Sequence, residues 1–294
     1  MKRTSLVFAL ACGLYACDGS DDAGAGSLKV SASGEQAALS GYPVGEGDDE
    51  IAFADGWTMV LGKVLISIGD FRLRTQDGDD AMVDSDPVVF DLHQGEPKLW
   101  SFDDVPAQRW DRVGYKYELP TSKTRTAGDV ANEDLEQMID EGYSLLVAGT
   151  ARKDGREIEF EYGFPFEITM DNCHNGIDDT DGLVIGDGAA AEAQITIHLD
   201  HLFFDDWAIE DPALRFDAMA EMAPAGGVLT LDDLAAQDNL SDLLDAAGAP
   251  LELGYDPGSE FEPVPENLRD LVISAATTTG HFNGEGHCDY ERTK

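Results

Sequence analysis

Alternation of apolar and polar residues is the main pattern along the chain up to residue 203. In residues 57–73 the apolar positions recur every second residue, with an interruption at Gly62, where a bulge or turn would fall. This alternation is typical of strands with one buried face. A short apolar run predicts a further strand over 87–92, and strands are also predicted over 98–102, 109–119 and 194–203.

The clearest supersecondary signal is a hairpin. Residues 144–151 and 157–168 both have strand patterns, and Lys153-Asp154-Gly155 separates them. Asp-Gly supplies the positive-φ residues that tight hairpin turns require. In the second arm three apolar residues alternate with three glutamates, which predicts one buried face and one solvated face.

Helical spacing appears at 132–141 and then dominates the last third of the chain. The predicted helices there are 212–222, 230–236, 240–247 and 267–276. Strands followed by helices predict a mainly β fold, an antiparallel β-sandwich with a small C-terminal helical appendage, in an α+β arrangement. We expect the β-sandwich over 51–206, and the helical appendage with a disulfide-tied C-terminal segment over 207–294.

The N-terminal region has a different composition. Residues 1–16 carry Lys2 and Arg3 followed by an apolar stretch that is too short to span a bilayer, which indicates an export signal. Residues 17–50 are rich in Asp, Gly, Ser and Ala, which predicts a flexible, acidic tether. A weak alternation over 27–33 predicts a short strand inside this tether.

The charge balance excludes several partners. The chain has 59 Asp and Glu against 19 Lys and Arg, giving a net charge of −40. An acidic surface repels phosphate, so we expect no nucleic acid and no polybasic docking on anionic lipid. The sequence lacks the nucleophile-elbow, phosphate-loop and dinucleotide motifs, which favours a non-enzymatic role without deciding it.

The end of the export signal resembles the lipobox of bacterial lipoproteins. Leu14-Tyr15-Ala16-Cys17 places an aliphatic residue three positions before a cysteine and a small residue directly before it. The resemblance implies that Cys17 is lipidated and that an N-terminal lipid holds the protein on a membrane of the bacterial cell envelope. The periplasmic side and the outer membrane or cell surface both remain open. The alternatives are processing at Cys12, or an ordinary secretory signal without lipid.

Two cysteines remain in the mature chain, Cys173 and Cys288. An extracytoplasmic compartment permits disulfides, so we expect a Cys173–Cys288 bridge. It would close a loop of roughly 115 residues and contribute about 4 kcal/mol in the chain-entropy model. Two free thiols are the alternative.

A second resemblance concerns the predicted sandwich. The segments 88–92, 105–107 and 113–119 resemble a layout common in largely uncharacterised bacterial lipoproteins with prealbumin-like or immunoglobulin-like sandwiches. The match covers roughly residues 57–170 and departs at Gln108-Arg109-Trp110, where Gly and Tyr are usual. It implies a fold and an envelope location. In location and β-rich build the chain is also similar, by distant analogy, to methanobactin-associated copper-binding lipoproteins, which assigns no residue roles.

The acidic loop over 171–182 is a candidate calcium site. It resembles short acidic segments in secreted proteins of some Gram-negative bacteria, and oxygen ligands at alternating spacing suit Ca²⁺. The candidate ligands are Asp171, Asn175, Asp178, Asp179 and Asp181. The alternative is a solvated acidic turn.

Histidines form the other candidate site. The predicted ligands of a divalent metal are His198, Asp200, His201, His281 and His287. The expected disulfide restrains His287 near the acidic loop, which leads into the strand that carries His198. Imidazole with carboxylate suits Zn, Cu or Fe, although the histidines could instead be separate.

These features predict a lipid-anchored extracytoplasmic protein that binds a divalent metal through a His-rich cluster. The main alternative is a structural or cell-surface interaction lipoprotein with a Ca-stabilised acidic loop and no transition-metal site. A third candidate is a hydrolytic metalloenzyme with the same histidines and Glu285 as the base.

Overall fold

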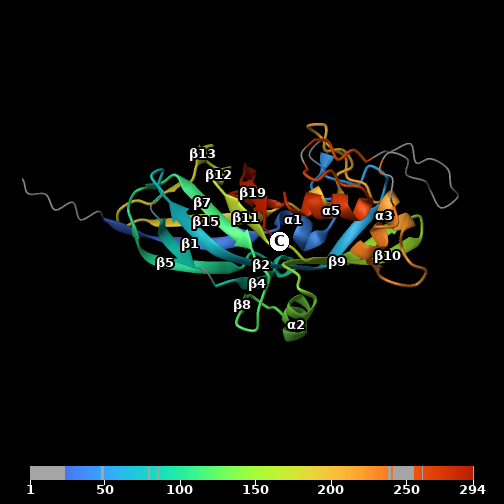
Figure 1. The fold of residues 1–294 in the computed structure, drawn as a ribbon, viewed down its shortest axis with the longest axis horizontal. Coiled ribbons are helices and arrows are strands. Elements are labelled where there is room, and N and C mark those ends of the chain that lie inside the picture. The colour runs from blue at the N-terminus through green and yellow to red at the C-terminus, as the bar shows by residue number, and fades with distance from the viewer. Residues whose placement is uncertain are drawn as a thin grey trace, which may run out of the picture.

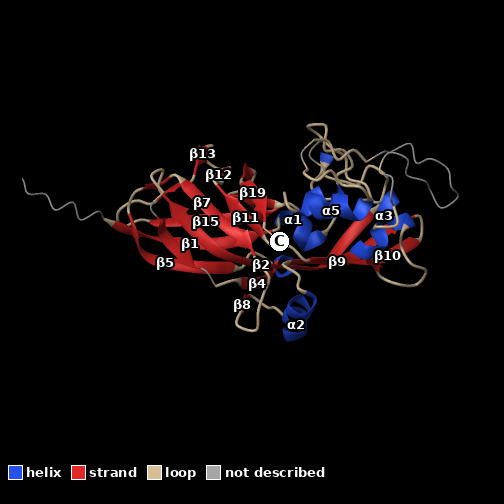
Figure 2. Cartoon of the chain, in the orientation of Figure 1, coloured by secondary structure: helices blue, strands red, loops and turns tan. Residues whose placement is uncertain are grey.

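The computed structural model describes residues 24–47, 50–78, 80–84, 86–237, 240, 255–259 and 261–293. In this part of the chain two β-sheets pack together and short helices lie against the larger sheet (Figures 1 and 2). This confirms the predicted mainly β sandwich with a small helical part. The expected export signal and Cys17 lie outside the described residues.

The smaller sheet has the strand order β18–β17–β15–β1–β5. Its members are β1 (Ala25–Ser33), β5 (Lys98–Pro106), β15 (Ala190–Ile197), β17 (Gly280–Phe282) and β18 (Gly286–His287). Strand β1 lies between β15, its parallel neighbour, and the antiparallel β5. The short strand predicted over 27–33 is confirmed, but the prediction of a tether through residue 50 is wrong. Alternate residues Leu28, Val30 and Ala32 are fully buried, so this segment belongs to the core.

The larger sheet is built around one long strand, β2 (Thr58–Arg74), which confirms the prediction for 57–73. Its path is β16–β10–β9–β2–β7–β11–β19; in addition β3 and β4 pair with β2, and β8 pairs with β4. The other members are β3 (Asp80–Asp84), β4 (Val88–Asp91), β7 (Arg112–Tyr117), β8 (Arg125–Ala127), β9 (Leu145–Lys153), β10 (Arg156–Phe164), β11 (Ile168–Asp171), β16 (Leu229–Thr230) and β19 (Asp289–Arg292). The pairing register of β2 with β9 shifts at Gly62, where a bulge was predicted.

The predicted hairpin is the β9–β10 pair. Asp154 and Gly155 form its turn with φ values of 51° and 81°, as an Asp-Gly turn requires. Two short pairs complete the strands: β12 (His174–Asn175) with β13 (Thr180–Asp181), and β6 (Arg109–Trp110) with β14 (Leu183–Val184).

Aromatic side chains join the two sheets. Phe71 on β2 stacks on Trp100 of β5 with ring centroids 5.7 Å apart. On β7, the buried Tyr115 donates a hydrogen bond to the His281 carbonyl at 3.1 Å, and the Tyr117 hydroxyl lies 3.0 Å from that of Thr279. The larger sheet therefore fixes the backbone at and beside β17, which carries a predicted metal ligand.

Helices cover both faces of the β2–β9–β10 region. The predicted helix over 132–141 is confirmed as α2 (Asn132–Glu141), and it ends where Gly142 adopts a left-handed conformation. Helix α2 packs on one face over Leu65, Val89 and Leu146, while α1, α3 and α5 lie on the other side (Figure 2). The bounds of the remaining helices are α1 (Glu35–Ser40), α3 (Asp217–Glu221), α4 (Leu231–Leu234) and α5 (Leu268–Ala276).

The C-terminal segment is more than the helical appendage predicted over 207–294. It contributes β17 and β18 to the smaller sheet and β16 and β19 to the larger one, so it is part of the sandwich. Of the predicted helix 212–222 only 217–221 is α-helical, and 241–247 lie outside the described residues. Within the described part of the chain, no helix has the length and hydrophobicity that a membrane crossing needs.

Candidate metal centre

Two histidines meet on one face of the smaller sheet. His281 on β17 lies opposite Thr196 of β15, and His198 is two residues beyond Thr196. Residues two apart on a strand point to the same face, which makes His198 and His281 diagonal neighbours. Their ring centroids are 4.1 Å apart, and the His198 amide donates to the Thr279 carbonyl at 2.9 Å.

His201 joins them through a helical turn. The prediction of a strand over 194–203 is wrong after Ile197, because Leu199–Phe203 forms the 3₁₀ helix η3 with His198 as its N-cap. In a 3₁₀ helix residues three apart lie on the same side. The His201 ring centroid is therefore 5.8 Å from that of His198 and 5.3 Å from that of His281.

These three side chains, which we call the histidine triad, can converge on one ion. Each offers a ring nitrogen, and the three nitrogens lie within 4.8 Å of one another. His198 is 7% exposed and His281 is 2% exposed, and neither His198 Nε2 nor His281 Nδ1 has a hydrogen-bond partner. A buried polar atom without a partner costs about 1–3 kcal/mol, which a bound metal would offset.

The hydrogen bonds of His201 determine its tautomer. Its Nδ1 lies 2.8 Å from the Thr278 hydroxyl oxygen, and that hydroxyl donates its proton to the Ala275 carbonyl at 2.8 Å. Because a hydroxyl has one proton to donate, Thr278 accepts the hydrogen bond from His201 Nδ1–H. In the neutral ring the Nε2 lone pair is then available to a metal.

The surroundings keep two of the triad's imidazoles neutral. Burial, reinforced by neighbouring histidines, lowers the pKa of His201 to about 3. Burial, with His198 and His287 nearby, also lowers the pKa of His281 to about 3. Neutral imidazole is the form that coordinates metals, so these side chains are in the ligating state near neutral pH.

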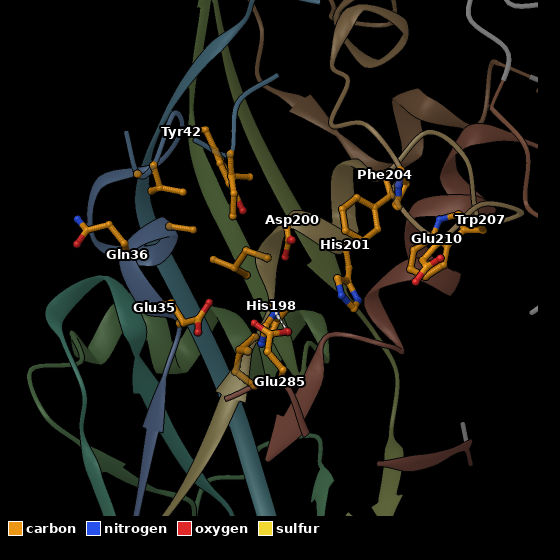
Figure 3. A pocket seen from close by; sticks show the side chains of 18 of the residues that line it. Glu35, Gln36, Tyr42, His198, Asp200, His201, Phe204, Trp207, Glu210 and Glu285 are labelled. Carbon is orange, nitrogen blue, oxygen red and sulfur yellow. Dashed lines mark ion pairs between the residues drawn. The ribbon is translucent and has the colours of Figure 1, made fainter. Parts of the chain in front are cut away.

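A pocket of about 660 Å³ opens onto two members of the triad, His198 and His201 (Figure 3). Phe204 and Trp207 pack against His201, with ring centroids 5.0 and 5.7 Å away. Glu35, Asp200 and Glu285 lie near His198 in the same pocket. A second cavity of about 330 Å³ is lined by His201, His281 and His287, so the triad stands between two hollows.

Of the five predicted metal ligands, the structure brings His198, His201 and His281 together. Asp200 lines the pocket but belongs to neither group of convergent donors among the described residues. Burial raises its pKa, and His198 opposes that shift. His287 lies beside His281, with ring centroids 4.8 Å apart, and is exposed.

Sequence reasoning missed Glu35, which lies in the interval predicted to be a tether. Its carboxylate, that of Glu285 and a nitrogen of His198 form a second group of donors within 4.8 Å. Burial raises the pKa of Glu35. Thr278, which orients His201, was missed as well. Neither position has a local sequence signal, because each acts through a partner distant in sequence.

In the acidic loop, the predicted calcium ligands make hydrogen bonds within the protein. Asp171 is hydrogen-bonded and ion-paired with Arg74. His174 lies 3.0 Å from an oxygen of Asp179 and 3.1 Å from an oxygen of Asp181. The Asn175 side-chain oxygen accepts from the Ile177 amide, and Asp178 accepts from the Thr180 hydroxyl.

The expected disulfide is present between Cys173 and Cys288, 115 residues apart. It connects the acidic loop to the chain directly after His287. Strand β18 pairs with β17, so the disulfide also anchors the hairpin that carries His281.

Comparisons with known proteins give the chain no family. No protein-family model and no curated protein matches the sequence. One solved structure, MbnP from Methylosinus trichosporium, is similar over 79% of this chain and 95% of that chain, with 12% sequence identity and a TM-score of 0.31. The site is therefore interpreted from its own residues.

Proposed function

We propose that this protein is a lipid-anchored, extracytoplasmic metal-binding protein of the bacterial cell envelope, and that the histidine triad holds a Zn, Cu or Fe ion. The observation that carries the proposal is the convergence of three imidazole nitrogens within 4.8 Å of one another. Two of these histidines, His198 and His281, also have a buried ring nitrogen without a hydrogen-bond partner. Three imidazoles suit these metals, and coordination would draw the nitrogens to about 3.4 Å apart at bonds near 2.1 Å.

Metal analysis of the full chain, purified without a polyhistidine tag, tests this function. We expect about one transition-metal ion per chain by mass spectrometry and its loss in His198→Ala and His281→Ala. His93→Ala is the matched control, since His93 hydrogen-bonds the Ala38 carbonyl at 2.9 Å and belongs to neither donor group. Protein that stays metal-free after incubation with Zn²⁺, Cu²⁺ and Fe²⁺ would exclude the function.

The envelope location is supported by the lipobox-like sequence and by a disulfide, which is typical of oxidising compartments. Labelling of cells with a radioactive fatty acid should mark the wild-type protein. Cys17→Ser should abolish the label and release the protein from the membrane fraction. Labelling that persists in Cys17→Ser would contradict lipidation at this residue.

A further inference from the structure

A second group of metal-ligating side chains adjoins the triad. One oxygen of Glu35, one oxygen of Glu285 and one nitrogen of His198 lie within 4.8 Å of one another, and His198 also belongs to the triad. We propose that Glu35, Glu285 and His198 form an outer cation-binding position, where a divalent metal ion is held before it passes to the triad. The transfer step rests on the proposed function, whereas the outer position does not.

The strand topology builds this position. Strands β1 and β15 are parallel neighbours in which Ser33 lies opposite Thr196. Glu35 and His198 each follow two residues later, so both emerge at the same end of adjacent strands.

A tight turn brings the third ligand. Glu285 follows Asn283 and Gly284, which have φ values of 51° and 84° between β17 and β18. The Asn283 amide donates to the Gln194 carbonyl at 2.8 Å, and the Gly284 amide donates to the Thr196 hydroxyl at 3.0 Å. These bonds hold the turn against β15, and Glu285 lies beside His198 (Figure 3).

Solvent exposure decreases from the outer position to His198, the residue that both groups of donors share. The Glu285 side chain is 80% exposed and Glu35 is exposed, whereas His198 is 7% exposed. The buried His198 Nε2 has no hydrogen-bond partner, and the hydroxyl of Tyr42 in the same pocket has none either. An ion would thus meet oxygen ligands at the solvent side and nitrogen ligands inside.

The two nitrogens of His198 differ in their surroundings. Nδ1 lies 3.8 Å from a Glu285 oxygen, and Nε2 is the buried, unpartnered nitrogen. Neutral imidazole has one lone pair for a metal and one N–H. An ion bound outside would take Nδ1, with the ring proton on Nε2. On transfer to the triad, Nε2 would release its proton to bind the ion, and the vacated Nδ1 would take up a proton from solvent on the side that faces Glu285. The two positions therefore exclude each other.

The distribution of acidic side chains favours movement of a cation from the outer position to the triad. Glu35, Asp200 and Glu285 are the acidic side chains around His198 in this pocket, whereas the candidate ligand atoms of the triad are imidazole nitrogens. Acidic groups at the mouth of a pocket raise the arrival rate of cations by factors of about 10–10³. The outer carboxylates should accordingly govern how fast the triad is loaded.

Stopped-flow mixing of the full chain with Co²⁺, followed by visible absorption, tests the path. We expect the rate at which Co²⁺ binds the triad to fall by a factor of about ten or more in Glu35→Gln/Glu285→Gln. Glu210→Gln, an exposed carboxylate on the same pocket outside both donor groups, is the control. A double variant that slows no more than this control would overturn the proposal.

A second measurement tests the outer position alone. In His201→Ala/His281→Ala, electron paramagnetic resonance should detect weak Mn²⁺ binding that disappears when Glu35→Gln and Glu285→Gln are added. If His201→Ala/His281→Ala with both glutamates intact binds no Mn²⁺, the proposal of an outer cation-binding position is wrong. Mn²⁺ binding without any Co²⁺ band in the wild type would instead overturn the triad's function and the transfer step.

Discussion

The ring of His201 donates a hydrogen bond to the hydroxyl oxygen of Thr278 at 2.8 Å, so its other nitrogen is free to bind a metal. The acceptor side of this bond is fixed because Thr278 donates to Ala275. The C-terminal end of helix α5, whose last residue is Ala276, thus orients the ring of His201, a proposed ligand on η3. Residues that orient metal-binding histidines are worth about 10–100-fold in affinity.

Thr278→Val should therefore weaken metal binding by about 10–100-fold, because it removes the acceptor and leaves the shape nearly unchanged. Competition with a chromophoric chelator measures the affinity. Thr277→Val is the control, because it removes a hydroxyl at the same helix end whose hydrogen bond goes to the Ser274 carbonyl instead of to a histidine. Equal losses in both variants would contradict a specific role for Thr278.

Removing the disulfide should destabilise the fold. Cys173→Ser/Cys288→Ser is expected to lower the free energy of unfolding by about 2–5 kcal/mol, because the unfolded chain loses a constraint across 115 residues. Urea denaturation measures the loss. Dithiothreitol should destabilise the wild type to a similar extent and leave the double variant unchanged; a wild type insensitive to the reductant at every urea concentration would argue against this role.

The Asp171–Arg74 pair should stabilise the protein in a pH-dependent way. Burial raises the Asp171 pKa, but hydrogen bonds from Arg74 and the Asn172 amide outweigh it, so the net shift is downward. A lowered pKa in the folded state stabilises the fold above the unfolded value, about 3.9, and this contribution is lost as the pH falls through the folded value.

Asp171→Asn is therefore expected to cost about 1 kcal/mol at pH 7 and less at pH 3, as measured by urea denaturation at both values. Asp178→Asn is the matched control in the same loop and should stay within about 0.5 kcal/mol of wild type. A cost for Asp171→Asn that is the same at both pH values would refute the electrostatic explanation.

Calcium should compete with His174 for the acidic loop. The pKa of His174 is raised because its ring donates hydrogen bonds to the carboxylates of Asp181 and then Asp179. The stabilisation from protonated His174 is thus fully present below the pKa of the unfolded state, about 6.5, and is lost as the pH rises through the pKa of the folded state. We expect Ca²⁺ to raise the melting temperature more at pH 8.5 than at pH 6, by differential scanning fluorimetry. In His174→Ala this difference should vanish, and a calcium effect independent of pH in the wild type would exclude the competition.

The sequence by itself determined the elements whose signals are local. Alternation predicted β2 with its irregularity at Gly62, Asp-Gly predicted the β9–β10 turn, and helical spacing predicted α2 to the residue. Counting cysteines predicted the Cys173–Cys288 disulfide. The histidines of the triad were named as well, because His198 and His201 are close in sequence and His281 lies in the same C-terminal cluster as His287, whose position the disulfide restrains.

Only the tertiary structure decided how these pieces combine. The acidic composition before residue 50 predicted a tether, yet β1 is buried between two strands, because pairing with distant β5 and β15 outweighs local composition. The same parallel pairing places Glu35 beside His198, across 163 residues of sequence (198 − 35 = 163). Strand partners and the tautomer of His201 depend on contacts between remote segments. Local periodicity carries no information on such contacts, and so the sequence named the three candidate ligands of the triad but not their arrangement.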